Sequence, residues 1–396
     1  MSRERTRPHA SSVDLVIAGC FSLFDFYIGP YSAGIRPFDL LGAGTLGVSR
    51  LSDTRRSTRW SPWRRIGAVL VLGVMTWALS LSLLQDVQAS WKPVTGVVLG
   101  LTVFILTCIR PAQPTAIEQF TRLLILLHAA ALVAQFTWYR LTGSILNFHA
   151  VVGGDPRLVG AFFRPAGLFL EPSLFSVCMT MLVLLRFRLL GRLDRVCVAG
   201  LASMLLSLSL LGVVAVAYIL VRARPVLGTL VSGAVAAAGV VAAALVPRDS
   251  AIYSLIVARL TNIGSDNSTA ARFGGLIGSN DEFGVVSMLF GGGIGYSYVS
   301  LGSSGVGFMI AAVGVVGLVL FMLGIALAAR QGGRLTAALD VLFLLLGAPF
   351  WTFFVWWWWL ATLVSVRGPV ASSRAVPSAP SSAGFVPSIS LNVQPD

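Results

Sequence analysis

Residues 303–329 read SSGVGFMIAAVGVVGLVLFMLGIALAA, and this stretch contains no charged side chain. A helix needs about 20 consecutive apolar residues to cross the ~30 Å hydrocarbon core of a bilayer, and this run is long enough. Comparable apolar runs recur along the chain, which is 56% hydrophobic and only 11% charged. The sequence therefore predicts an all-α polytopic integral membrane protein.

Short polar connectors separate the apolar runs. We place the runs at 13–30, 37–49, 66–85, 94–109, 121–139, 172–189, 196–222, 225–246, 303–329 and 336–366. Two of them, 196–222 and 336–366, are difficult to fit as single helices. The segment Ser207-Leu-Ser209 interrupts the first, and Pro349, which cannot continue a helix, interrupts the second. Splitting both stretches predicts about 12 transmembrane helices, within a range of 10–12.

The distribution of basic residues favours the same topology. The formal net charge is +13, but the basic residues lie in short connectors, which fits the positive-inside bias and not a nucleic-acid-binding domain. With both stretches split, more of the basic residues are cytoplasmic than when 196–222 is one span. The transmembrane domain then covers 1–369, with extracytoplasmic loops at about 140–171 and 247–302. We expect residues 370–396, rich in Ser and Pro, to be a disordered cytoplasmic tail.

Two polar islands lie in these two external loops. Residues 164–173 read RPAGLFLEPS, and residues 259–272 read RLTNIGSDNSTAAR. Charged side chains set between apolar spans are costly unless they meet a partner or a substrate. We therefore expect the functional residues to lie in these two polar islands.

Four motifs follow one another in a fixed order. They are 164–173 before an apolar span, Ser207–Gly212 within a later one, Asp266–Arg272, and Leu289–Gly295. Over roughly residues 140–325, their order and spacing resemble the O-antigen and capsular polysaccharide polymerase and ligase superfamily. The resemblance implies a GT-C-like glycosyltransferase in the bacterial cytoplasmic membrane. Its substrate would be a polyprenyl-pyrophosphate-linked oligosaccharide, and a chain-length regulator and a flippase would be partners besides the lipid bilayer.

The resemblance covers two activities. The polymerase branch extends a glycan by lipid-linked repeat units, whereas the ligase branch moves the finished glycan to another acceptor and usually carries a His-Ser pair in the late external loop. Residues 296–304 contain no histidine, which favours a polymerase of an O-antigen, capsular or exopolysaccharide chain. A ligase stays an alternative. So does a transporter of lipid-linked oligosaccharide, which predicts internal repeats and charges near the membrane midplane.

The chemistry of glycosyl transfer selects the candidate residues. The leaving pyrophosphate needs cations, which arginine supplies with a planar fork, and the acceptor hydroxyl needs a base. The candidates for catalysis are Glu171, Asp266, Arg164 and Arg272. The candidates for substrate binding are Arg259, Arg140, Arg157, His149, Ser173 and Ser268. The preferred bases are Glu171 and then Asp266, followed by Asp281, Glu282 and His149. The sequence has no DxD or HExxH motif and no His/Cys cluster, so we expect no metal and no cofactor.

Structural roles for these residues stay open as alternatives. Arg164 and Glu171 are spaced to form an ion pair at the membrane boundary. Asp266 suits a helix N-cap, and Arg259 suits an interfacial position in which its charge reaches water.

Three other features have mainly structural interpretations. The glycine run 291–295 lacks a P-loop lysine and is more typical of a tight turn than of a phosphate cradle. Residues Trp356–Trp359 predict an aromatic anchor at the membrane interface, with a sugar-stacking surface as the alternative. Asp340, within an apolar run, predicts a polar contact between helices.

Overall fold

The computed structural model describes residues 19–21, 37–52, 60–84, 91–109, 111–148, 158–159, 162–169, 171–226, 228–230, 233, 284–294, 305–329, 333–347 and 354–366. The first polar island lies largely within these residues. The second, at 259–272, lies outside them.

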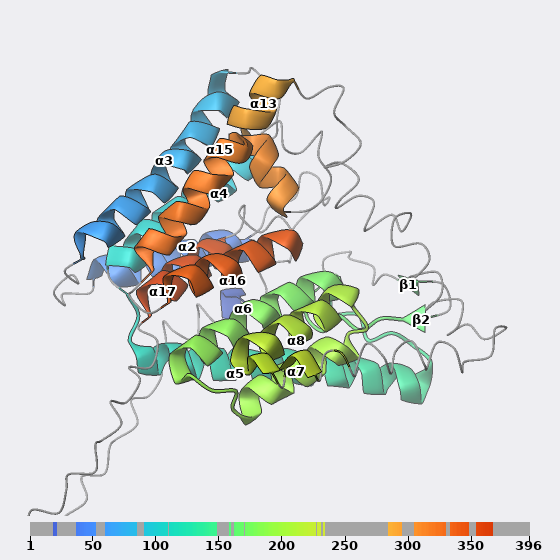
Figure 1. The fold of residues 1–396 in the computed structure, drawn as a ribbon. Helices are drawn as coiled ribbons and strands as arrows, with labels where there is room; N and C mark the ends of the chain where they lie inside the picture. Colours follow the sequence, from blue (N-terminus) through green and yellow to red (C-terminus); the bar gives the residue numbers. More distant parts are fainter. Residues whose placement is uncertain are drawn as a thin grey trace, which may run out of the picture.

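Helices dominate the described chain, together with one pair of two-residue strands (Figure 1). In chain order the elements are α2 (Pro37–Ser52), α3 (Pro62–Leu84), α4 (Trp91–Ile109), α5 (Pro114–Thr142), β1 (Leu158–Val159), β2 (Phe162–Phe163), α6 (Pro172–Leu190), α7 (Arg195–Leu206), α8 (Leu210–Ala223), α13 (Val285–Phe290), α15 (Gly305–Ala328), α16 (Arg334–Gly347) and α17 (Phe354–Ser365). The two strands pair antiparallel, with Leu158 opposite Phe163.

Within the described residues, four helices are long and apolar enough to cross a membrane, namely α3, α5, α6 and α15. This confirms the prediction of a helical membrane protein. Local sequence sets the ends of two of them. α5 and α6 begin with proline, which has no backbone N–H and so leaves no unsatisfied donor at the first position of the helix. They end at Gly143 and Gly191, whose φ angles of 68° and 69° suit glycine at a helix C-terminus.

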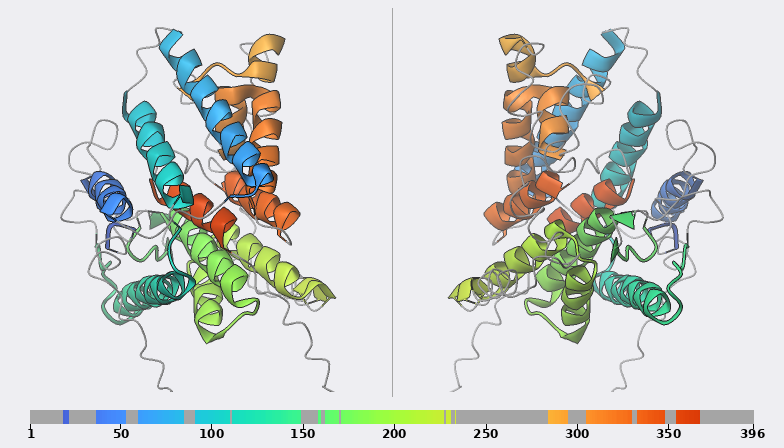
Figure 2. Two further views of the ribbon diagram at one scale, coloured as in Figure 1. Left: turned by 90° about the vertical axis from the view of Figure 1, so that its left-hand side faces the viewer. Right: turned by 90° about the vertical axis from the view of Figure 1, so that its right-hand side faces the viewer.

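The helices pack in two groups (Figures 1 and 2). One group consists of α5, α6, α7 and α8. In the other, α3 runs along α15, which also contacts α13, while α4 contacts α2. The last two helices connect the groups, since α16 contacts α15 and α6, and α17 contacts α4 and α6.

The tryptophans of α17 lie in the protein interior. Every residue from Val355 to Ser365 is buried. Trp357 occupies space left by the missing side chain of Gly100 on α4, and Trp359 Nε1 donates a hydrogen bond of 2.8 Å to the carbonyl of Met181 on α6. Protein therefore covers these side chains, and the prediction of an interfacial anchor at Trp356–Trp359 is wrong.

The stretch 196–222 forms two helices, as the sequence predicts. α7 ends at Leu206 and α8 begins at Leu210, and between them Leu208 has a φ of 52°, in the left-handed region. The Ser207 hydroxyl donates to the Met204 carbonyl at 2.7 Å and accepts from the Ser209 N–H at 3.4 Å. Serine side chains thus satisfy backbone groups that the break frees in an apolar setting.

Gly314 interrupts α15 with a non-helical φ of 73° and ψ of 175°. The carbonyls of the turn before it accept hydrogen bonds from outside the helix. Gly292 N–H donates to Ala311 at 2.7 Å, and Gly293 N–H donates to Ala312 at 3.0 Å. Because Gly292 and Gly293 donate their N–H groups to α15, residues 291–293 pack on a helix, and these two donors are not available to a phosphate.

Glycines also bring α3 and α15 into backbone contact. A Cβ on Gly67 would overlap Gly324 and Ala328 of α15. One turn earlier, Arg64 Nε donates to the Ala328 carbonyl at 3.1 Å, and this arginine is only 7% exposed. Transmembrane helices associate through such close packing, because lipid tails leave little hydrophobic gain between them.

This contact predicts a matched pair of results. Gly67→Ala is expected to lower the free energy of unfolding by about 1–3 kcal/mol, because the added methyl group forces α3 away from α15. Gly73→Ala is the control on the same helix, since its ideal Cβ meets nothing within 4 Å. Thermal unfolding of the purified protein in detergent measures the effect, and equal melting temperatures for the two variants would contradict the contact.

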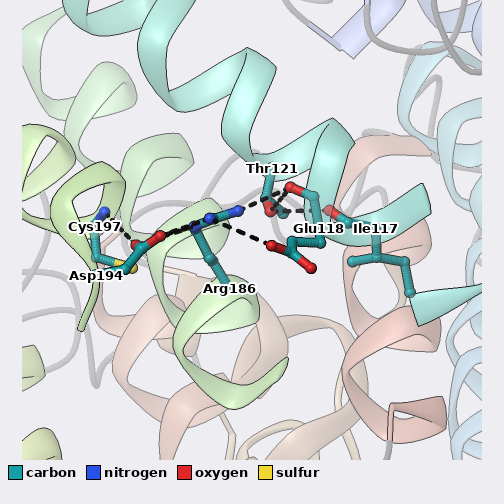
Figure 3. A network of polar contacts seen from close by, with 6 residues as sticks. All are labelled: Ile117, Glu118, Thr121, Arg186, Asp194 and Cys197. Atoms are coloured by element: carbon teal, nitrogen blue, oxygen red, sulfur yellow. Dashed lines mark hydrogen bonds and ion pairs between the residues drawn. The ribbon is translucent and has the colours of Figure 1, made fainter. Parts of the chain in front are cut away.

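A buried arginine joins α5, α6 and α7 (Figure 3). The Arg186 side chain is 4% exposed, and its Nη2 lies 2.6 Å from Asp194 Oδ2. Its Nη1 donates to the Glu118 carbonyl on α5 at 2.8 Å. Asp194 is the N-cap of α7 and accepts the Cys197 N–H at 3.0 Å. Partial burial raises the pKa of Asp194, but the hydrogen bonds from Arg186 and Cys197 outweigh it, so the pKa is held below its usual range.

Candidate functional site

The described part of the first polar island lies along the middle of α5. Gly167 has a φ of 60°, and an added Cβ there would lie 3.4 Å from the His128 carbonyl oxygen and from the Leu132 amide nitrogen. Glycine therefore suits this position for two reasons, its backbone conformation and the nearness of the helix. The loop carrying Arg164 follows the surface of α5 closely.

Gln135 fixes this loop through one buried amide. Its Oε1 accepts the N–H of Ala166 at 2.9 Å and of Gly167 at 3.0 Å. Its Nε2 donates to the Leu146 carbonyl at 2.9 Å. The side chain is only 4% exposed, so all three hydrogen bonds are shielded. One residue of α5 thus determines the path of the backbone on both sides of the 149–161 segment.

Arg164 and Glu171 flank the segment that Gln135 holds. Arg164 follows Phe163, whose ring lies 4.9 Å from that of Tyr139 on α5. Glu171 is the N-cap residue of α6, where its carbonyl accepts the Phe175 N–H at 3.0 Å and its side chain makes no capping bond. Both side chains are half-buried. The structure thus gives each a defined backbone position and partial access to solvent.

The start of α6 also orients the Glu171 carboxylate. Ser173 Oγ donates to Glu171 Oε2 at 3.2 Å. The N-terminus of a helix carries partial positive charge, which favours a carboxylate beside it. Ser173, which the sequence predicts to bind substrate, therefore hydrogen-bonds in the structure to Glu171, the predicted base.

The second sequence motif packs against the first turn of α6. The hydroxyls of Ser176 and Ser207 lie 3.3 Å apart. On α8, a Cβ at Gly212 would lie 2.9 Å from Ser176 Oγ and 2.6 Å from the Met204 carbonyl oxygen, so only glycine fits. The small residues of this motif let α8 approach α6 immediately after Glu171. The structure therefore brings together the first two motifs.

The described part of the fourth motif has other neighbours. Residues 289–294 lie against α3 and α15, where Trp77 Nε1 donates to the Phe290 carbonyl at 2.9 Å and the Ile294 N–H donates to Ser82 Oγ at 2.6 Å.

Arg140 is exposed in the last turn of α5, a position at which a cation suits the helix dipole. The remaining predicted site residues lie outside the described residues; they are Asp266, Arg272, Arg259, Arg157, His149, Ser268, Asp281 and Glu282.

Two residues beneath the loop escaped the sequence analysis. Gln135 is one, and His128, two turns earlier on the same side of α5, is the other. The His128 ring stacks on Phe169 of the loop with centroids 4.9 Å apart, and neither ring nitrogen has a hydrogen-bond partner among the described residues. The signal for both was a polar side chain inside an apolar span, which is costly and often functional. Phe169 thus covers a titratable group directly below the candidate site.

Removal of the Gln135 amide should release the loop. Gln135→Leu leaves the buried N–H groups of Ala166 and Gly167 without an acceptor, at a cost of about 1–3 kcal/mol each. We expect faster hydrogen exchange in a peptide covering 162–169, with unchanged exchange in 176–190. Gln135→Glu keeps the acceptor and should show a smaller increase. Unchanged exchange of 162–169 in Gln135→Leu would mean that other contacts hold the loop.

Within the described part of the chain, no group of three or more His, Cys, Asp and Glu side chains could hold a metal ion. No protein-family model, curated protein or solved structure matches this chain.

Proposed function

We propose that this chain is a membrane glycosyltransferase that polymerises polyprenyl-pyrophosphate-linked oligosaccharide repeat units into an O-antigen, capsular or exopolysaccharide chain. In this proposal it has twelve spans in a GT-C-like arrangement and acts on the extracytoplasmic face of a bacterial cytoplasmic membrane. The start of α6 supports it most strongly. There Glu171, oriented by Ser173, meets the loop of Arg164 and the second motif that carries the family resemblance.

The reaction assigns a role to each group. The acceptor hydroxyl attacks the anomeric carbon of the donor sugar, and the bond between that carbon and the pyrophosphate oxygen breaks. Glu171 accepts the hydroxyl proton, as a positioned general base. Arg164, joined by Arg272 from the second island, balances the charge of the leaving pyrophosphate through bidentate hydrogen bonds.

The rigidity of the site fits this chemistry. Charge stabilisation is most effective when the donors are already in place before the reaction. The Gln135 amide holds the backbone two residues after Arg164, and the first turn of α6 holds Glu171. The backbone near each group is therefore held by a helix, by α5 through Gln135 in the loop of Arg164 and by α6 at Glu171.

The glycan phenotype of a deletion strain tests the proposal. We expect single lipid-linked repeat units outside the membrane and no longer chains, because polymerisation is the missing step. Wild-type chain should restore polymer, and Arg164→Ala should not. Arg192→Ala, an exposed arginine at the other end of α6, is the control and should restore polymer.

Two other phenotypes would contradict a polymerase. Long polymer that stays on its lipid carrier would indicate a ligase. Repeat units trapped on the cytoplasmic face would indicate a transporter, which is the second candidate because α15 is interrupted at Gly314 and transporters build substrate sites from broken helices.

A further inference from the structure

Three helices bring charged side chains together at the end of α6 that is remote from Glu171. They are Arg188 on α6, Arg222 on α8 and Asp340 on α16. Arg222 Nε lies 3.7 Å from Asp340 Oδ1, and the hydroxyl of Tyr218 donates to the same oxygen at 2.6 Å. This confirms the predicted interhelical polar contact of Asp340, which is 2% exposed.

Among the described residues, the charges in this cluster do not balance. Two guanidinium groups, those of Arg188 and Arg222, interact with the single carboxylate of Asp340. Arg188 is 8% exposed, and its Nε and Nη1 have no hydrogen-bond partner among the described residues. Arg222 Nε has none either. Buried arginine N–H groups without acceptors are costly. A bound anion would supply the missing acceptors and the missing negative charge.

The position of the Arg188 guanidinium is fixed. Its Nη2 donates to the Gly333 carbonyl at 3.3 Å, immediately before α16. A Cβ on Gly333 would lie 2.6 Å from that nitrogen, so the glycine leaves the space that the guanidinium uses. Arg334 follows as the first residue of α16 and adds another positive charge, and the N-terminus of this helix favours anions.

The location of the cluster points to the kind of anion. It lies where the apolar helices α6 and α8 end, and the ends of such helices meet the phosphate layer of a bilayer. Arginine forks match phosphate oxygens, and basic pockets between membrane helices bind anionic headgroups. Arg222, with 27% of its side chain exposed, provides the open side.

We propose that Arg188 and Arg222 form a binding site for a phosphate group, supplied by the headgroup of an anionic phospholipid. The bound phosphate provides acceptors for the N–H groups that have no partner among the described residues, and it joins the ends of α6, α8 and α16. Asp340, which also accepts from Tyr218, keeps Arg222 in position, and the Gly333 carbonyl keeps Arg188 in position. This site does not depend on the glycosyltransferase proposal, because it lies at the other end of α6 and its readout is binding.

The test compares the melting temperature of the purified full chain in detergent with phosphatidylglycerol, phosphatidylcholine or inorganic phosphate added. Phosphatidylglycerol should raise the melting temperature by on the order of 5 °C, and phosphatidylcholine should not. A rise with inorganic phosphate alone would support the phosphate site and assign it to a soluble ligand. Arg188→Gln and Arg222→Gln should each lose most of the rise, whereas Arg192→Gln should keep it.

Native mass spectrometry of the same variants keeps the result interpretable if Arg188→Gln proves unstable. Wild type and Arg192→Gln should retain a bound phosphatidylglycerol. Arg222→Gln, which changes a partly exposed side chain, should retain at least tenfold less. Retention of the lipid by Arg222→Gln at the wild-type level would overturn the site. The absence of any effect of both phosphatidylglycerol and inorganic phosphate on wild type would overturn it as well.

Discussion

Glu171→Gln is expected to lower the rate of glycan extension by about 10²- to 10⁴-fold while the lipid-linked substrate still binds. The amide keeps the shape of the side chain and still accepts the hydrogen bond that Ser173 donates at 3.2 Å. It cannot take up a proton, so a base role predicts loss of turnover without loss of fold. Purified protein in vesicles, supplied with repeat units isolated from the deletion strain, measures the rate.

Ser173→Ala is the matched control for this experiment. It removes one hydrogen bond to Glu171 and leaves the base, so we expect a loss of about tenfold or less. Binding of the substrate and the melting temperature should stay near those of wild type in both variants. Near-normal turnover of Glu171→Gln would assign the carboxylate to the structural ion-pair role and remove it from the mechanism.

Arg186→Leu should produce the largest loss of stability in the described structure, about 3–5 kcal/mol. The substitution leaves Asp194 without its cation and removes the donor to the Glu118 carbonyl on α5. Three helices meet at this side chain, so its removal loosens more than one contact (Figure 3). The melting temperature in detergent measures the effect, with Arg192→Leu, an exposed neighbour, as the control.

The pH dependence of stability gives a second test of the ion pair between Arg186 and Asp194. Because folding lowers the pKa of Asp194, the pair stabilises the protein fully above the unfolded carboxyl pKa of about 3.9. The stabilisation is lost as the pH falls from there through the folded pKa. Wild type and Arg186→Leu should therefore differ most near neutral pH and converge in strong acid. A constant difference at all pH values would mean that packing, and not the charge pair, is responsible.

Length and composition predicted the fold class and one of its irregular features. The apolar runs at 66–85 and 303–329 suffice to identify membrane helices, because hydrocarbon thickness sets a minimum length, and the structure forms α3 and α15 there. The break around Leu208 was also predictable, since its run was too long for one span and carried serines at the centre. The interruption at Gly314 was not predictable, because glycine is frequent in transmembrane helices and does not by itself mark a break.

The tryptophans of α17 show what composition cannot resolve. Trp356–Trp359 have the residue type of a membrane interface, but whether lipid or protein covers them depends on distant residues, such as Gly100 for Trp357 and Met181 for Trp359. Gln135 and His128 escaped for a related reason. Their roles arise from the loop folding back over α5 from more than 30 residues later in the chain, and the periodicity of α5 alone carries no information about it.

The packing of α17 also dictates the order in which the protein can be completed during synthesis. α4 leaves the ribosome early. The space beside its Gly100 is filled by Trp357 of α17, which is the last helix described. At about 5–20 residues per second, the roughly 245 residues between them take on the order of 10–50 s to make. During that interval the space beside Gly100 lacks the side chain that fills it in the complete chain. Nascent chains that stop before 354 should therefore be inserted in the membrane yet unfinished, and exposed to quality-control proteases.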